Sequence, residues 1–154
     1  MERVLVTGSG GFIGSHLVKF LKEKGYWVRG VDIKYPEFSE TKADEFLILD
    51  LREKVNCLKA VIGVTKIYQL AANMGGMGFI SSNGLASYET SLKINMNMAE
   101  AADWGKTRIL FSSSACVYPT NKLDIVNPLP IKEEDVLPAM PNEDYGWEKL
   151  TAEK

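Results

Sequence analysis

The chain has 154 residues, of which 45% are hydrophobic and 25% charged, and its formal net charge is −2. This balance predicts a soluble globular protein with a hydrophobic core, and the slightly acidic charge argues against a general binder of nucleic-acid backbones. The single histidine excludes a His-rich metal site, and no apolar run approaches the roughly 20 residues that span a bilayer, so neither a metal nor a membrane is expected.

Short apolar runs alternate with amphipathic segments along the chain. Strands are predicted where aliphatic residues run up to a glycine or an aspartate, and helices where apolar residues recur every three or four positions. The predicted strands cover residues 4–6, 27–31, 46–49, 66–70 and 108–111. The predicted helices cover residues 12–24, 55–62 and 85–104, with a last one beginning near residue 142 or 144. A Gly- and Met-rich loop is expected at 73–79 and irregular, proline-rich chain at 119–141.

The apolar faces of two helices follow from the same periodicity. The first helix is expected to bury Phe12, Ile13, Leu17, Phe20 and Leu21. The second is expected to bury Val55, Leu58, Val61 and Ile62.

The element order predicts an α/β fold. Strands alternating with helices indicate a Rossmann-type, doubly wound parallel sheet that binds ligands at the carboxyl ends of its strands. We expect residues 1–154 to form one dinucleotide-binding domain. The last helix has no stop signal before Lys154. The chain is therefore expected to be the N-terminal fragment of a longer protein, with the last strands and a substrate domain outside it.

Glycines occupy the turn between the first strand and the first helix. Gly8, Gly11 and Gly14 have the spacing and the strand-to-helix context of a nucleotide fingerprint. Without a Cβ, the turn can approach a pyrophosphate, and the helix that starts at Phe12 and Ile13 offers N–H groups and a positive dipole end. A glycine turn that merely reverses the chain is the alternative.

Asp32 ends the second strand about twenty residues further on, where a carboxylate can accept hydrogen bonds from the adenosine ribose. The same charge would repel a 2′-phosphate, so NAD is favoured over NADP, although Lys34 could soften that preference. Taken alone, Asp32 is better explained as a turn residue at the start of a loop. Asp50, after the third strand, is placed where it could meet the adenine amino group.

Tyr145 and Lys149 are four residues apart, so on a helix their side chains share one face. An ammonium near a phenol favours the phenolate and makes the tyrosine a better base. The same lysine can hydrogen-bond the nicotinamide ribose, so Tyr145 and Lys149 are also candidates for cofactor binding. Ser114, just past the fifth strand, could hold the substrate hydroxyl that Tyr145 deprotonates. On its own, the 112–114 serine run is typical of a strand-end turn.

In combination these motifs resemble the extended short-chain dehydrogenase/reductase family, the group of NAD-dependent nucleotide-sugar epimerases and dehydratases. The resemblance covers the whole chain. It implies an NAD cofactor, contact of Asp50 and Leu51 with adenine, and a homodimer paired through long helices. It also implies that the cofactor is lined by Leu70, Ala71 and Ala72.

Cys116 indicates which members of the family the chain resembles most. Family dehydratases carry an acidic pair at the positions of Ala115 and Cys116, and simple 4-epimerases usually carry threonine at the second. Cysteine is found there in enzymes that epimerise neighbouring carbons of a GDP-sugar. Segments 70–79 and 113–119 resemble the epimerases that invert C3 and C5 of GDP-mannose. This resemblance implies a GDP-sugar substrate held by Gly75, Gly76, Met77, Ser114 and Cys116.

The cysteine also suits the chemistry. Transient oxidation at C4 acidifies the neighbouring C–H groups, and a thiolate can then remove one of those protons. A small buried hydrophobe is the alternative role for Cys116. Three other functions stay open: an epimerase/reductase of GDP-sugars that consumes NADPH, another nucleotide-sugar epimerase, and a dinucleotide-binding module without turnover.

The long central helix departs from the family pattern. The family usually has an asparagine where this chain has Ser91, and Asn95 and Asn97 follow one to two turns later. Whether any of them replaces it is left open by the sequence. Only two cysteines and no signal peptide favour the cytoplasm.

Overall fold

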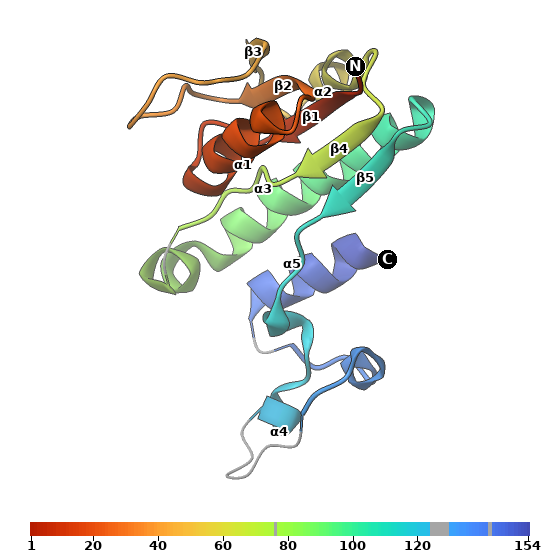
Figure 1. Ribbon diagram of the computed structural model, residues 1–154. Helices are drawn as coiled ribbons and strands as arrows, with labels where there is room; N and C mark the ends of the chain where they lie inside the picture. The colour runs from red at the N-terminus through yellow and green to blue at the C-terminus, as the bar shows by residue number, and fades with distance from the viewer. Residues whose placement is uncertain (76, 124–129, 142) are drawn as a thin grey trace. The chain divides into compact units, whose positions relative to one another are not determined.

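The computed structural model describes residues 1–75, 77–123, 130–141 and 143–154 (Figure 1). The chain divides into two units. The first comprises residues 1–72 and 93–112, and the second comprises residues 73–92 and 113–154. Among the described residues, no helix combines the length and the apolar character needed to cross a bilayer.

Five parallel strands form the centre of the first unit, in the order β3-β2-β1-β4-β5 (Figure 1). Strand β1 lies in the middle, with β2 on one side and β4 on the other. The chain thus winds outward in one direction and returns to continue in the other, which places a topological switch point beside β1. The strands are β1 (Arg3–Thr7), β2 (Trp27–Asp32), β3 (Glu45–Ile48), β4 (Lys66–Gln69) and β5 (Arg108–Phe111). The doubly wound parallel fold expected from the sequence is confirmed.

Helices cover both faces of this sheet, because neighbouring residues of a strand point to opposite faces. On one face, Val4 and Val6 pack with Val18 and Leu21 of α1 (Phe12–Glu23). On the other face, Leu5 belongs to a cluster completed by α2 (Lys54–Val61) and the second half of α3 (Met77–Trp104). That second cluster includes Val31, Cys57, Ala60, Ile67, Ile94, Met98 and Ala101.

The predicted buried face of α1 was wrong in part. The helix buries Gly14, Val18 and Leu21. A Cβ on Gly14 would lie 2.1 Å from the Gly8 carbonyl oxygen, so this position must face the turn, and it sets the rotation of the helix. The exposed residues of the predicted face are Phe12, Ile13 and Phe20.

The predicted face of α2 also needs correction. Cys57, Ala60 and Val61 are buried, whereas Val55 and Ile62 are exposed. The small side chains Cys57 and Ala60 allow α2 to lie close to the sheet. Hydrophobic periodicity alone does not predict that small residues occupy the buried face.

Helix α3 starts earlier than the sequence predicts. It begins at Met77 and contains one non-helical residue, Asn83 (φ −130°, ψ 23°). The short helical segment before Asn83 occupies part of the predicted Gly- and Met-rich loop, while the longer segment after it matches the predicted central helix.

The second unit contains the first part of α3 and the chain after β5. It holds the 3-10 turn η1 (Ala115–Val117), α4 (Thr120–Leu123), the 3-10 turn η2 (Glu133–Val136) and α5 (Asp144–Glu153). The predicted irregular region therefore contains short helical turns. The predicted last helix is confirmed at Asp144.

A buried arginine joins three elements of the first unit. Arg29 on β2 is 7% exposed, and its Nε donates to Glu45 on β3 at 2.6 Å. Its Nη1 donates to the carbonyl oxygens of Ala60 and Ile62 at 2.8 and 2.7 Å, where α2 ends. The guanidinium thus satisfies helix-end carbonyls that have no partner within the helix.

Replacing Arg29 by methionine keeps most of the aliphatic stem and removes these donors. We expect Arg29→Met to lower the free energy of unfolding by about 2–3 kcal/mol, because hydrogen bonds to charged groups are strong and the Ala60 carbonyl would stay buried without its donor. Urea unfolding measures this. The matched control is Arg3→Met, whose guanidinium lies over the Trp27 ring at the exposed start of β1, with an expected loss below about 1 kcal/mol. Equal losses in the two variants would contradict the assignment.

Candidate functional site

Backbone crowding defines the turn after β1. Gly8 has φ +68°, and a Cβ there would lie 2.9 Å from the backbone nitrogen of Ala71, just after β4. A Cβ on Gly10 would lie 2.3 Å from the carbonyl oxygen of Lys34, just after β2. Real side chains do not fit at such distances, so the turn is packed backbone against backbone between the ends of two strands.

Asp32 is tied to this turn. Its carboxylate accepts a hydrogen bond from the Gly10 N–H at 2.8 Å, and from the N–H groups of Ile33 and Lys34 at 2.7 and 3.4 Å. Asp32 therefore combines the turn role with a fixed position beside the glycines. Sequence spacing singled out Gly8, Gly11 and Gly14 but missed Gly10, because only the fold brings Gly10 against Asp32.

Lys34 has a partner of its own. Its ammonium pairs with the Glu37 carboxylate in the loop between β2 and β3, and Glu37 raises the pKa of Lys34. The positive charge closest in sequence to Asp32 is thus offset by a carboxylate. This pairing weakens the case for Lys34 as a partner of a 2′-phosphate.

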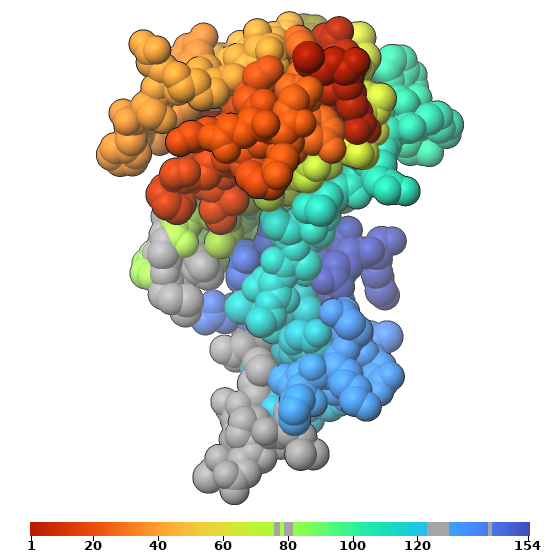
Figure 2. All heavy atoms as spheres, viewed as in Figure 1, coloured from red at the N-terminus to blue at the C-terminus, as the bar shows by residue number. Residues whose placement is uncertain are grey.

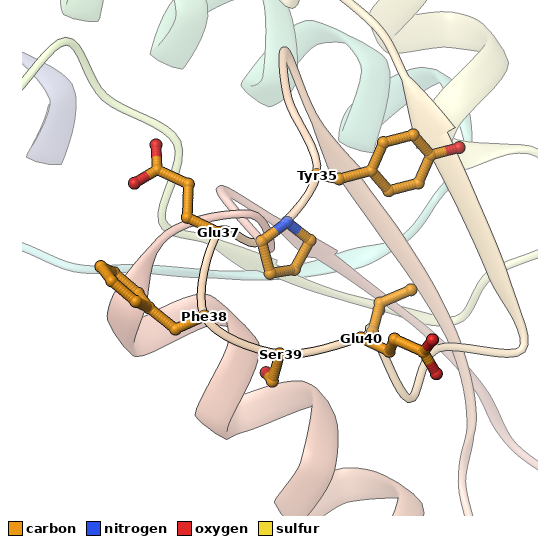
Figure 3. A pocket seen from close by; sticks show the side chains of 7 residues that line it. Tyr35, Glu37, Phe38, Ser39 and Glu40 are labelled. Carbon is orange, nitrogen blue, oxygen red and sulfur yellow. The ribbon is translucent and has the colours of Figure 1, made fainter.

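The β2–β3 loop is a surface feature of the first unit (Figure 2, orange). Residues 35–41 surround an open hollow of about 690 Å³. Tyr35 and Phe38 point in opposite directions from the loop, and Phe38 is 94% exposed (Figure 3). A second hollow of about 620 Å³ lies between this loop and the start of α1, where Phe12 and His16 line it.

A buried polar network fixes the end of β4. The Thr7 hydroxyl donates to Gln69 Oε1 at 2.6 Å and accepts from the N–H groups of Leu70 and Ala71 at 3.1 and 3.2 Å. Gln69 Nε2 in turn donates to the Ala71 carbonyl and to Asn95 Oδ1, each at 3.0 Å. The backbone of the predicted cofactor-lining segment is held by these bonds.

Sequence reasoning did not select Thr7 or Gln69 for any role. The sequence signal for these two residues is their position: each is a polar residue at the last position of a strand, Thr7 of β1 and Gln69 of β4. Asn95 is one of the candidate replacements for the family asparagine. Its Oδ1 accepts the hydrogen bond from Gln69 Nε2 and so belongs to this network.

The turn after β3 is held in a similar way. The Arg52 guanidinium bonds to the Asp50 carboxylate at 2.6–3.0 Å and lowers the pKa of Asp50. Asn97 Nδ2 donates to the carbonyl oxygens of Leu51 and Arg52 at 3.2 and 2.9 Å. Leu51 is buried in the core. Asn97 therefore positions the predicted adenine-side segment.

In the second unit, two serines of α3 hold the start of the Gly- and Met-rich segment. Ser91 Oγ accepts from the Asn73 N–H at 3.0 Å, and the Ser87 hydroxyl donates to the Asn73 carbonyl. The two serines are four residues apart and both are buried. Gly75 follows two residues later, Met77 begins α3, and Gly76 lies outside the described residues.

Helix α5 carries the predicted tyrosine and lysine. The Lys149 Nζ lies 5.6 Å from the centre of the Tyr145 ring, and 3.8 Å from a carboxylate oxygen of Glu148. Lys149 and Glu148 are both buried. Burial lowers the pKa of Lys149, and Glu148 opposes that shift. Glu148 was not predicted as a site residue, because an acidic residue next to a lysine is typical of the solvent-exposed face of a helix.

Helix α5 packs against the turn that carries Cys116. A Cβ on Gly146 would lie 2.3 Å from the Cys116 carbonyl oxygen, so the glycine permits this contact. The Ser114 hydroxyl accepts from the Cys116 N–H at 3.1 Å and caps η1. Its O–H hydrogen is not used in that bond. Cys116 is exposed in this structure, unlike a small buried hydrophobe.

The predicted site residues are divided between the two units. The catalytic candidates of the second unit are Ser114, Cys116, Tyr145 and Lys149. The cofactor candidates of the first unit are Gly8, Gly11, Phe12, Ile13, Gly14, Asp32, Asp50, Leu51, Leu70, Ala71 and Ala72.

Comparison with known protein families identifies the family of this chain. Residues 4–154 match the model of the NAD dependent epimerase/dehydratase family. The chain belongs to this family. The resemblance read from its glycine turn and its Tyr145/Lys149 pair is therefore confirmed.

Relatives and solved structures agree with this placement. The chain is 43% identical to GDP-mannose 3,5-epimerase of Arabidopsis thaliana and to GDP-mannose 3,5-epimerase 1 of Oryza sativa subsp. japonica. These matches cover 99% of the chain but only 41% of each relative. Among solved structures, UDP-glucose 4-epimerase from Brucella ovis in complex with NAD superposes with a TM-score of 0.82 at 25% identity, over 99% of this chain and 46% of that one.

The two cysteines are expected to differ in reactivity. Cys116 is exposed, whereas burial raises the pKa of Cys57 to about 12, and its thiol donates to the Leu51 carbonyl. Because the thiolate is the reactive form, an aromatic disulfide reagent should release one equivalent of chromophore from the native protein and two after denaturation. Cys116→Ser should abolish the native reaction. A fast native reaction in that variant would contradict the assignment.

Proposed function

We propose that the protein is an NAD-dependent nucleotide-sugar epimerase that inverts C3 and C5 of GDP-mannose. The chain spans 41% of the length of the GDP-mannose 3,5-epimerases it resembles. The observation that carries the proposal is the exposed Cys116, presented by a turn that packs on the helix of Tyr145 and Lys149. A proton-transferring thiol beside a Tyr/Lys pair suits an epimerase that works next to the oxidised carbon.

The residues of the first unit fit an NAD cofactor. The turn of Gly8 and Gly10 leaves no room for a Cβ and brings the start of α1 close to the strand ends, where the N–H groups of Phe12 and Ile13 can bind a pyrophosphate. Asp32 holds its carboxylate at that turn, where it can accept hydrogen bonds from ribose hydroxyls and would repel a 2′-phosphate. In this proposal Asp50 and Leu51 contact the adenine, and Leu70, Ala71 and Ala72 line the cofactor. Bound NAD supplies a reversible hydride acceptor for C4 of the sugar.

Tyr145 acts as the base for the C4 hydroxyl. The nearby Lys149 ammonium stabilises the phenolate that the reaction needs. Ser114 donates its free O–H hydrogen toward the sugar oxygen while its oxygen keeps the cap on η1. These three residues orient the hydroxyl and hold its proton during oxidation, and they return that proton when C4 is reduced again.

Cys116 moves protons at carbon. Once C4 is a carbonyl, the hydrogens on C3 and C5 are acidic, and a thiolate on one face of the ring can accept one of them. Inversion requires that a proton be returned from the opposite face. The segment that contains Gly75, Gly76 and Met77 is proposed to hold the sugar. The Asn73 backbone at its start is held by Ser87 and Ser91.

Solvent isotope incorporation tests the proposal. In heavy water, the natural polypeptide should introduce deuterium at C3 and C5 of GDP-mannose with catalytic NAD and no net NADH. Nuclear magnetic resonance of the recovered sugar nucleotide measures the label. Consumption of NADPH on a 4-keto GDP-sugar, without this exchange, would instead identify an epimerase/reductase. Neither exchange nor turnover would leave a dinucleotide-binding module.

Cys116→Ser separates the proton step from the hydride step. We expect the variant to lose deuterium exchange by about 100-fold or more, as for removal of a general acid–base group, while NAD affinity stays within about twofold. Exchange is measured as above, and NAD affinity by calorimetry. Loss of NAD binding would show that Cys116 is structural, and full exchange would remove it from the mechanism.

A further inference from the structure

A small cavity in the second unit lies beside the Tyr145/Lys149 pair. It has a volume of about 10 Å³, and is lined by Gly84, Ser87 and Tyr88 of α3 and by Tyr145 and Glu148 of α5. The Glu148 carboxyl group is thus enclosed between two helices of the same unit and is 1% exposed. A cavity of this size holds about one water molecule at most.

Removing a carboxylate and an ammonium from water is costly, and such groups stay charged only when they are paired. Glu148 and Lys149 meet this condition, with 3.8 Å between the Glu148 oxygen and the Lys149 Nζ. Their side chains are 1% and 6% exposed.

Other ionisable groups surround the pair within the described residues. Tyr145 lies on the same helix and Tyr88 faces Glu148 across the cavity from α3. Asp144 lies at the start of α5 near Gly84, and Cys116 belongs to the turn packed on Gly146. Within the described residues, Glu148 is the acidic side chain that lies within 4 Å of the Lys149 Nζ.

We propose that Glu148 is a positioning residue of the proposed reaction, whose buried carboxylate keeps Lys149 protonated and oriented beside Tyr145. This role rests on the proposed function, in which the Lys149 ammonium stabilises the Tyr145 phenolate. Burial alone works against the charged form of Lys149, and Glu148 opposes that effect. The charge that assists Tyr145 therefore depends on a neighbour that need not touch the substrate.

The protonation of Lys149 can be followed without any activity. Lysine labelled with ¹³C at Cε gives one resonance for each lysine, and Lys149→Arg identifies the signal of Lys149. In Glu148→Gln, which keeps the shape of the side chain, the midpoint of the Lys149 titration should fall by about one pH unit or more, a tenfold change in proton affinity. The matched control is Glu143→Gln at the exposed start of α5, which should leave the midpoint unchanged.

Glu148→Asp provides a second variant if the glutamine variant does not fold. Its shorter side chain withdraws the charge from Nζ, so the midpoint should fall in the same direction by a smaller amount. An unchanged or raised midpoint in the folded variants would overturn the proposal.

The pH profile of the reaction links this effect to function. If wild-type protein shows deuterium exchange, the alkaline limb of its profile should move to lower pH in Glu148→Gln and stay in place in Glu143→Gln. An unshifted limb would overturn the proposed role of Glu148 while leaving the epimerase intact. Absence of exchange in wild-type protein would refute the proposed function, and the lysine titration would still decide whether Glu148 keeps Lys149 charged.

Discussion

The close approach of the turn after β1 to the ends of β2 and β4 is the constraint on which the first unit depends. Gly8 and Gly10 leave no room for side chains, and the Gly10 N–H is fixed by the Asp32 carboxylate at 2.8 Å. Gly14 brings α1 onto the same turn, which sets the rotation of the helix and therefore the burial of Val18 and Leu21. One packing requirement thus determines the turn, the helix and the position of Asp32.

Polar side chains also fix the backbone at the neighbouring strand ends. Thr7, Gln69 and Asn95 hold the backbone after β4, and Asn97 holds the backbone after β3. Each bonded group is satisfied by a specific partner, so the network favours a single arrangement of the strand ends. Pre-ordered backbone of this kind lowers the entropic cost of binding a ligand at the sheet edge.

The second unit arranges its polar groups around two helices and one turn. Gly146 permits the contact between α5 and η1, and the Ser114 cap shapes the turn from which Cys116 is exposed. Lys149 is buried next to Glu148 of the same helix, with 3.8 Å between the Lys149 Nζ and a Glu148 carboxylate oxygen. The second unit thus combines an exposed Cys116 with a buried Lys149.

Much of the fold was predictable because strongly apolar strands and glycine stops leave few alternatives. The five strands, the parallel order and the helix carrying Tyr145 follow from such signals. The buried face of α1 was not predictable, because a steric contact at Gly14 outweighed hydrophobicity and left Phe12 and Phe20 exposed.

Residues whose roles arise from tertiary contacts were also missed. Gly10 acquires its role only where β2 ends beside the turn, and Gln69 only where β1, β4 and α3 meet. Glu148 has no distinguishing pattern in the sequence, because its burial depends on the packing of α3 against α5. The roles of Ser114, Cys116, Tyr145 and Lys149 remain predictions.

Parallel calorimetric titrations of NAD and NADP into the protein test the central claim, that the crowded turn and Asp32 form a site for NAD. The account predicts that NAD binds at least about tenfold more tightly than NADP, because a 2′-phosphate would meet the Asp32 carboxylate and because Lys34 is paired with Glu37. Equal or tighter binding of NADP, or no binding of either dinucleotide, would contradict it.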